Sequence, residues 1–106
     1  MSAIAIVYAL FGDRAAAEQA AVTMVEQRLA ACANVLASCL SVYHWEGKLE
    51  RAEESPVLFK TSLDRRDALI AALAAGHAYA VPAISGWSVT TTLDYAAWVE
   101  AETQAL

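Results

Sequence analysis

The sequence predicts an α+β domain in which a ferredoxin-like βαββαβ order is followed by an extra C-terminal helix. Segments with strand character alternate along the chain with segments whose apolar residues recur every three or four positions, as in helices. In the stretch YHWEGKLE, residues 43–50, a glycine separates two strand-like segments, as in a long hairpin. These observations predict one domain over residues 1–106, with two helices on one face of a four-stranded antiparallel sheet.

The first two elements are a buried strand and a helix. Residues 4–10 are short, apolar and rich in β-branched side chains, which favours a buried strand. In the turn that follows, Asp13 has the side chain of a helix N-cap. From there to Cys32, one apolar stripe at three- and four-residue steps predicts a helix.

The hairpin comes next. Residues 35–45 predict a long strand, and residues 49–61 predict the strand that returns. Gly47 gives the turn between them the backbone freedom that a tight turn needs. Pro56 has no N–H for a strand ladder, so we expect the return strand to lie at an edge or to carry a bulge there.

The C-terminal part predicts a helix, a strand and a last helix. Ser62 or Asp64 caps a helix that ends at Gly76. Residues 81–89 predict the fourth strand, and the sequence TTLD, residues 91–94, resembles the N-terminal cap of the last helix.

The composition predicts a subunit interface. Of the residues, 58% are hydrophobic and 18% are charged, which is more apolar than a typical soluble monomer. The two helices leave one face of the sheet bare. Contact with other copies of the chain is therefore the simplest way to bury this apolar surface.

Other partners are disfavoured by the sequence. No apolar run approaches the roughly 20 residues of a membrane-spanning helix. A net charge of −5 without any basic cluster is unlike a nucleic-acid-binding surface. The N-terminus lacks the regions of a signal peptide, and Cys32 and Cys39 make no disulfide framework, so we expect a cytoplasmic location.

Known catalytic motifs do not occur in the sequence. There is no nucleophile elbow, phosphate-binding loop, dinucleotide fingerprint or zinc-protease motif. Only two histidines are present, so candidates for a general base are few. We expect a protein that is not an enzyme.

His44 and His77 are the candidate metal ligands. A neutral imidazole binds copper or zinc, whereas a single histidine in a connection more often caps or packs, so both interpretations stay open. Cys32 and Cys39 lack the spacing of a metal knuckle, so the favoured interpretation is that both cysteines are small buried hydrophobic residues.

Two further groups have open interpretations. Glu54 and Lys60 share one face of an unbroken strand, where they could pair, hold a small anion or carboxylate, or form a solvated surface pair. The aromatic residues could line a pocket, but interface anchors are the favoured interpretation. They are Tyr43, Trp45, Trp87, Tyr95 and Trp98.

Several motifs together resemble the CutA divalent-cation tolerance family. They are RLAACAN (28–34), SVYHWEGKLE (41–50), Glu54 with Lys60-Thr61, HAYAVP (77–82) and DYAAW (94–98). They occur in the family's order over nearly the whole chain. The resemblance implies a ferredoxin-like subunit in a tight homotrimer like that of the PII signalling proteins. It also implies a link to the tolerance of copper and other divalent cations.

In such a trimer, clefts between subunits would hold a divalent metal or a small ligand. The cleft residues that the resemblance suggests are Tyr43, Trp45, Glu46, Lys48, Glu54, Lys60, Tyr79 and Trp98. The alternative interpretation is a PII-like signalling or small-ligand module without a metal role.

The sequence departs from the family pattern around the expected metal site. Ala83 stands where the family has a glutamate, and Gly76 precedes a single histidine, His77. Tyr8 or Ala9 stands where the family has a cysteine on the first strand. The metal site is therefore assigned to His77 alone, with copper or another divalent cation as its occupant.

Overall fold

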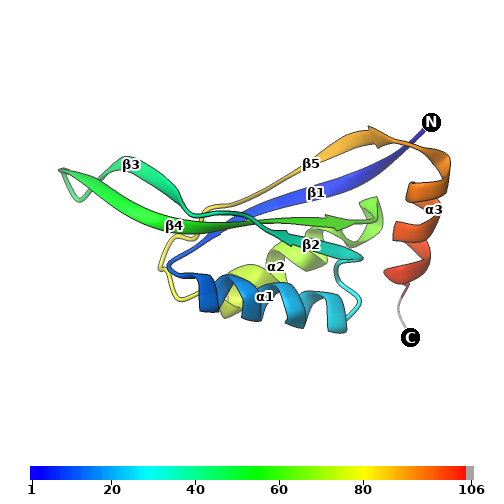
Figure 1. Cartoon of the computed structure of the whole chain (residues 1–106), viewed down its shortest axis with the longest axis horizontal. Coiled ribbons are helices and arrows are strands. Elements are labelled where there is room, and N and C mark those ends of the chain that lie inside the picture. Colours follow the sequence, from blue (N-terminus) through cyan, green and yellow to red (C-terminus); the bar gives the residue numbers. More distant parts are fainter. Residues whose placement is uncertain (105–106) are drawn as a thin grey trace.

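The fold is an antiparallel sheet with two helices on one face and a third helix at one end (Figure 1). The computed structural model describes residues 1–104. The elements are β1 (Ser2–Phe11), α1 (Arg14–Glu26), β2 (Cys32–Val35), β3 (Cys39–Trp45), β4 (Lys48–Thr61), α2 (Arg66–Gly76), β5 (Ile84–Thr91) and α3 (Leu93–Glu102), with a 3₁₀ turn over Leu63–Arg65. The predicted α+β class and its C-terminal helix are confirmed.

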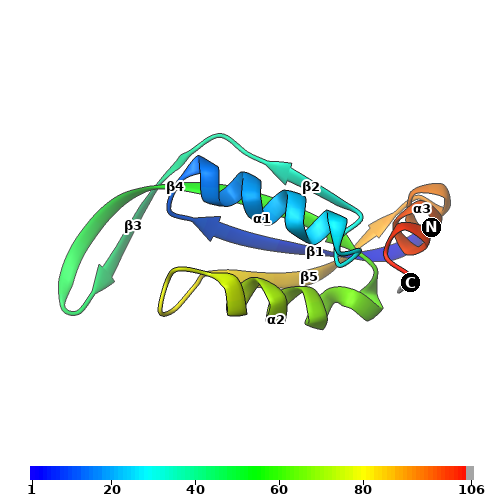
Figure 2. The ribbon, with the colours of Figure 1, turned by 90° about the horizontal axis from the view of Figure 1, so that it is seen from below.

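The sheet has the strand order β2-β4-β1-β5, and β3 pairs with the outer part of β4. In β1 the residues Ala5, Val7 and Ala9 are fully buried, since alternate side chains of a strand point to the same face. That face carries α1 and α2, as Figure 2 shows from below. The main core joins it to β4 and both helices through Val7, Ala9, Phe11, Ala17, Ala21, Met24, Val57, Phe59, Leu69 and Leu73.

The hairpin turn and the packing of α2 depend on two glycines. Glu46 and Gly47, the residues between β3 and β4, have φ values of 51° and 81°, so both adopt the left-handed conformation that two-residue hairpin turns favour. Gly86 lies where a Cβ would be 3.1 Å from Ile70 Cδ1. The absence of a side chain there lets α2 pack closely on β5.

The first helix is shorter than the predicted helix, which was expected to reach Cys32. It ends at Glu26 because Arg28 adopts a left-handed φ of 62°, and the N–H groups of Leu29 and Ala30 both bond to the carbonyl of Met24. A helix usually ends this way at a glycine. Here an arginine takes that conformation, and its side chain pairs with Glu102.

The sheet has five strands and not the four expected, because β3 covers most of the predicted strand over 35–45 and a separate strand, β2, precedes it and ends at Val35. Val35 pairs with Val57 and Cys39 pairs with Glu54, so three residues of one chain segment face two of β4. The extra residue is a bulge opposite Pro56. The expected bulge is thus on the neighbouring segment, while β4 itself is continuous. The last predicted strand also starts later, at Ile84 and not at residue 81.

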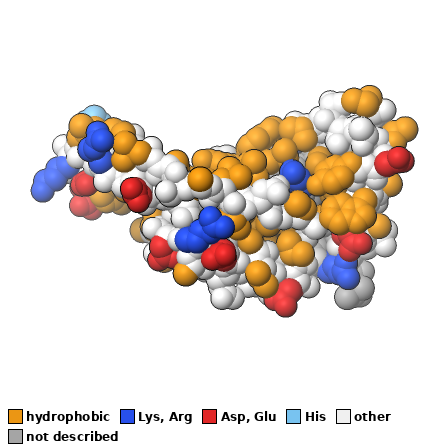
Figure 3. All heavy atoms as spheres, in the orientation of Figure 1, with side chains coloured by type: hydrophobic (Ala, Val, Ile, Leu, Met, Phe, Trp, Pro, Cys, Tyr) orange, Lys and Arg blue, Asp and Glu red, His pale blue; other side chains and the backbone are white. Residues whose placement is uncertain are grey.

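Much apolar surface stays uncovered within the described chain. Leu40 and Val42 on the hairpin are each 54% exposed, and Leu49 is 63% exposed. Figure 3 shows hydrophobic side chains over β1 and β5, away from α1 and α2, and along the hairpin arm. None of the helices between residues 1 and 104 has the length and apolarity that a bilayer span requires.

Candidate functional site

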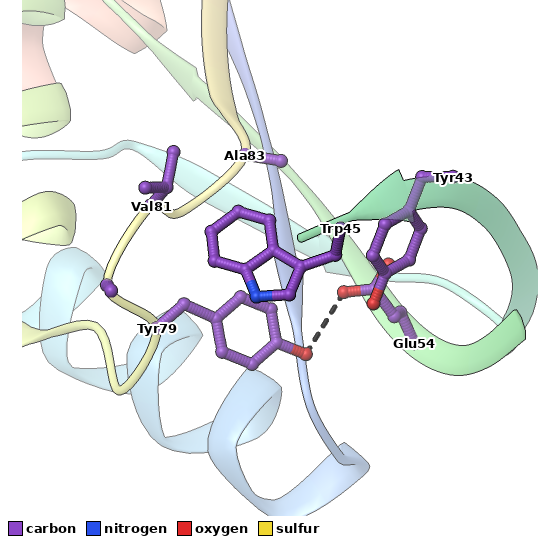
Figure 4. Close-up of a pocket in the computed structure, with 7 residues that line it drawn as sticks. Tyr43, Trp45, Glu54, Tyr79, Val81 and Ala83 are labelled. Carbon is purple, nitrogen blue, oxygen red and sulfur yellow. Dashed lines mark hydrogen bonds between the residues drawn. The ribbon is translucent and has the colours of Figure 1, made fainter. Parts of the chain in front are cut away.

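A cavity of about 360 Å³ lies where the hairpin approaches the α2–β5 connection. Its lining residues come from three segments: β3, β4 and the connection (Figure 4). They are Tyr43, Trp45, Glu54, Tyr79, Ala80, Val81 and Ala83. Tyr43 and Trp45 point to the same side of β3 because they are two residues apart. The hairpin curves to the side on which the connection lies (Figure 2), and Figure 4 shows Trp45 beside Tyr79 and Tyr43 beside Glu54.

His77 fixes the connection to the end of β1. Its Nε2 lies 2.7 Å from the carbonyl oxygen of Leu10, and its Nδ1 accepts the backbone N–H of Tyr79 at 3.0 Å. A carbonyl only accepts and Nδ1 is itself an acceptor here, so the two contacts fit the tautomer with its proton on Nε2. The ring also stacks on Phe11 at a centroid distance of 4.9 Å. This arrangement positions Tyr79 at the cavity.

These contacts define what His77 offers to a metal. Both ring nitrogens are already used inside the chain, so a metal ion would have to replace one of these hydrogen bonds. His44 lies on the exposed hairpin, away from the connection. Between residues 1 and 104, no three His, Cys, Asp or Glu side chains come together as a metal cluster.

Glu54 and Tyr79 form the polar part of the cavity. The Tyr79 hydroxyl donates to Glu54 Oε2 at 3.0 Å, and Glu54 is only 6% exposed. Burial of the phenol, then the hydrogen bond and charge of Glu54, raise the pKa of Tyr79 to about 12. Burial, then Cys39 and Glu54, raise the pKa of Tyr8 as well. Tyr79 therefore stays protonated, and a hydrogen-bond donor, at neutral pH.

The family model described as "CutA1 divalent ion tolerance protein" matches residues 5–102 of this chain. The chain belongs to the CutA1 family. A "Divalent-cation tolerance protein CutA" from Salmonella newport (strain SL254) is 38% identical over 90 residues, which are 84% of this chain and 78% of that protein. The resemblance noted from the sequence motifs is confirmed.

Solved CutA structures share the fold over almost the full chain. The crystal structure of CutA from Xylella fastidiosa has a TM-score of 0.90 at 31% identity and covers 95% of this chain and 98% of that one. The crystal structure of Pyrococcus horikoshii CutA has a TM-score of 0.89 at 37% identity and covers 94% and 99%.

The structure places the eight residues predicted for one cleft in three separate groups. Tyr43, Trp45, Glu54 and Tyr79 line the cavity together. Glu46 and Lys48 are exposed at the hairpin turn. Lys60 and Trp98 gather around Tyr95: the Lys60 Nζ is 6.0 Å from its ring centroid, and Trp98 stacks on it at 5.7 Å. Within the described chain Lys60 forms no ion pair with Glu54.

Three small apolar residues of the cavity were not predicted as site residues. Ala80, Val81 and Ala83 line it from the connection. Their side chains carry no chemical signal that a sequence pattern could identify. Ala83 was noted only because CutA1 relatives were expected to have a glutamate there. Its methyl group makes this side of the cavity apolar.

Proposed function

We propose that this chain acts as a cytoplasmic homotrimer in the tolerance of divalent cations, copper among them. Membership of the CutA1 family carries the cation role. The exposed apolar hairpin supports the assembly, because a surface with Leu40, Val42 and Leu49 uncovered needs a partner. If copies meet head to tail at this surface, the contact closes into a ring of three when the rotation between neighbouring copies is one third of a turn.

The assembly is tested by light scattering after size-exclusion chromatography. A homotrimer has three times the chain mass of 11.3 kDa. A mass equal to that of one chain would count directly against the proposal.

For the metal itself, we propose His77 as the ligand, with further ligands supplied by a neighbouring subunit. A metal ion would exchange with one of the two hydrogen bonds of the ring. Calorimetric titration with Cu²⁺ compares the wild type with His77→Ala, and with His44→Ala as the exposed control. Equal, negligible heats in the wild type and His77→Ala would remove this metal site.

A second candidate function is a PII-like module that binds a small ligand without catalysis. The aromatic cavity favours it, since a volume of about 360 Å³ lies within the range of small-molecule sites. A thermal-shift screen tests it, because a ligand that binds only the folded protein raises its apparent stability. A screen of metabolite-sized compounds without any stabilising hit would contradict this candidate.

A further inference from the structure

Glu54 is a buried carboxylate without a cation. It is 6% exposed, and among the described residues only its Oε2 has a hydrogen-bond partner, the Tyr79 hydroxyl. Three ion pairs occur over residues 1–104, and Glu54 belongs to none of them. No side-chain oxygen or nitrogen between residues 1 and 104 is both fully buried and unpaired, so the second oxygen of Glu54 is open to solvent at the cavity. A cationic ligand in the cavity can therefore pair with this oxygen.

The walls above this carboxylate are aromatic. Tyr43, Trp45 and Tyr79 are 42%, 47% and 38% exposed, whereas Glu54 beneath them is buried. Figure 4 shows the three rings gathered around the Glu54 carboxylate. None of the aromatic stacking pairs in the described chain joins any two of these three rings. Within residues 1–104, Tyr43 and Trp45 take part in no aromatic pair and Tyr79 only in the tilted pair with His77, so ring faces remain for a ligand.

We propose that the cavity binds a small organic ammonium cation, with the positive nitrogen held between Glu54 and the aromatic rings. Aromatic faces attract cations, and sites for quaternary ammonium groups combine several such rings. The apolar side chains of Ala80, Val81 and Ala83 suit the carbon atoms of such a ligand. This inference rests on the small-ligand function proposed above and specifies its chemical class.

A divalent metal ion suits the same cavity less well. Metal ions in proteins take four or more oxygen, nitrogen or sulfur ligands. Here one carboxylate is accompanied by phenols, an indole and alkyl groups. An organic cation, which needs charge and apolar contact together, matches both kinds of wall.

The ammonium or guanidinium group could come from a free compound or from a second copy of the chain. Lys48 and Arg51 lie on the hairpin, where Figure 3 shows basic side chains, and neither has an ion-pair partner within residues 1–104. In the assembled protein, such a side chain could occupy the same aromatic cavity.

Choline and its neutral isostere 3,3-dimethylbutan-1-ol test the proposal by calorimetric titration of the assembled protein. Cation–π contact with rings that are partly removed from water predicts about tenfold tighter binding of choline. Glu54→Gln keeps an acceptor for the Tyr79 hydroxyl but removes the charge, so we expect about tenfold weaker choline binding. Glu53→Gln, on an exposed neighbour in the same strand, is the matched control. Trp45→Leu should weaken binding, while Trp98→Leu should not.

The variants Lys48→Gln and Arg51→Gln distinguish the two sources of the cation. Choline binding by the wild type supports a free compound. Binding gained only in one of these variants shows that a side chain of a second copy occupies the cavity, which supports the same chemistry. Equal affinity for both probes, or affinity unchanged by Glu54→Gln, overturns the proposal. If the screen finds only neutral or anionic ligands and choline binds to no variant, the ammonium class is wrong but the small-ligand function survives. A screen without hits removes the small-ligand function too.

Discussion

The hydroxyl of Tyr79 donates to the carboxylate of Glu54 over 3.0 Å and thereby ties the α2–β5 connection to the base of the hairpin. The two residues lie 25 positions apart in the sequence, so this bond joins segments on either side of α2. Their contact forms the polar part of the cavity. Changes to either residue should therefore affect both stability and binding.

Tyr79→Phe should lower the free energy of unfolding by about 1 to 2 kcal/mol, because it leaves the buried Glu54 oxygen without its donor. Chemical denaturation at one fixed protein concentration measures this. Tyr43→Phe is the control, since no hydrogen bond of the Tyr43 hydroxyl occurs between residues 1 and 104. In a double-mutant cycle with Glu54→Ala, which removes the acceptor, the absence of a coupling energy would argue against the bond.

Stability should fall at alkaline pH through Tyr79. Its folded pKa of about 12 lies above the ordinary value of 10.0, so the protonated form is favoured by folding. The contribution is complete below pH 10 and is lost as the pH rises toward 12. Because Tyr79 is 38% exposed, solvent screening limits it to about 1 kcal/mol. Denaturation of the wild type and Tyr79→Phe over this window should give converging stabilities; parallel curves would contradict the assignment.

His77→Ala should destabilise the protein by about 2 kcal/mol, because the ring makes two hydrogen bonds and stacks on Phe11. His44→Ala, on the exposed hairpin, should change stability by less than about 0.5 kcal/mol. Nitrogen NMR of the imidazole should show the proton on Nε2. A proton on Nδ1 at neutral pH would contradict the hydrogen bond from Tyr79.

Arg28→Ala should be less stable than Arg28→Gly by about 1 kcal/mol, because Arg28 has a left-handed φ of 62° that glycine adopts without strain. Both variants lose the ion pair with Glu102, so their difference in unfolding free energy isolates the backbone effect. If the two variants had equal unfolding free energies, the left-handed conformation at position 28 would cost alanine nothing, which would contradict the prediction.

Val42→Lys should reduce the assembled mass, because a charge would be placed in the apolar hairpin surface that we propose as the interface. Light scattering at several concentrations measures this. Val22→Lys on α1 is a close match, since Val22 is 56% and Val42 is 54% exposed. If both variants kept the wild-type mass, the hairpin would not be the contact.

The sequence predicts the element types well where a pattern repeats. The apolar, β-branched run of β1, the two-residue period in β3 and the glycine turn at Gly47 predicted the sheet and the hairpin. The end of α1 could not be predicted, since an arginine at position 28 carries no sign of a left-handed conformation. The break between β2 and β3 depends on one extra residue, which leaves no trace in the hydrophobic pattern.

Only part of the site could be predicted, for a similar reason. Tyr43, Trp45, Glu54 and Tyr79 carry chemistry that a sequence displays, so they were among the candidates. Which of them meet depends on the curvature of the hairpin, which residue types do not specify. Lys60 and Trp98 seemed part of the same group, yet they lie around Tyr95 instead.

The bulge opposite Pro56 reconciles two different registers along β4. In β2, even-numbered residues pair with even-numbered residues of β4, as Cys32 does with Lys60. Beyond the bulge the parity is reversed, and odd-numbered β3 residues pair with even-numbered ones, as Cys39 does with Glu54. The two-residue turn at Glu46 and Gly47 fixes the β3 register, and this places Tyr43 and Trp45 on the same face as Glu54. The extra residue between Val35 and Cys39 lets β2 pair with the same strand in the opposite parity. A one-residue change of register between β3 and β4 would turn both rings to the opposite face and leave the carboxylate without its aromatic walls.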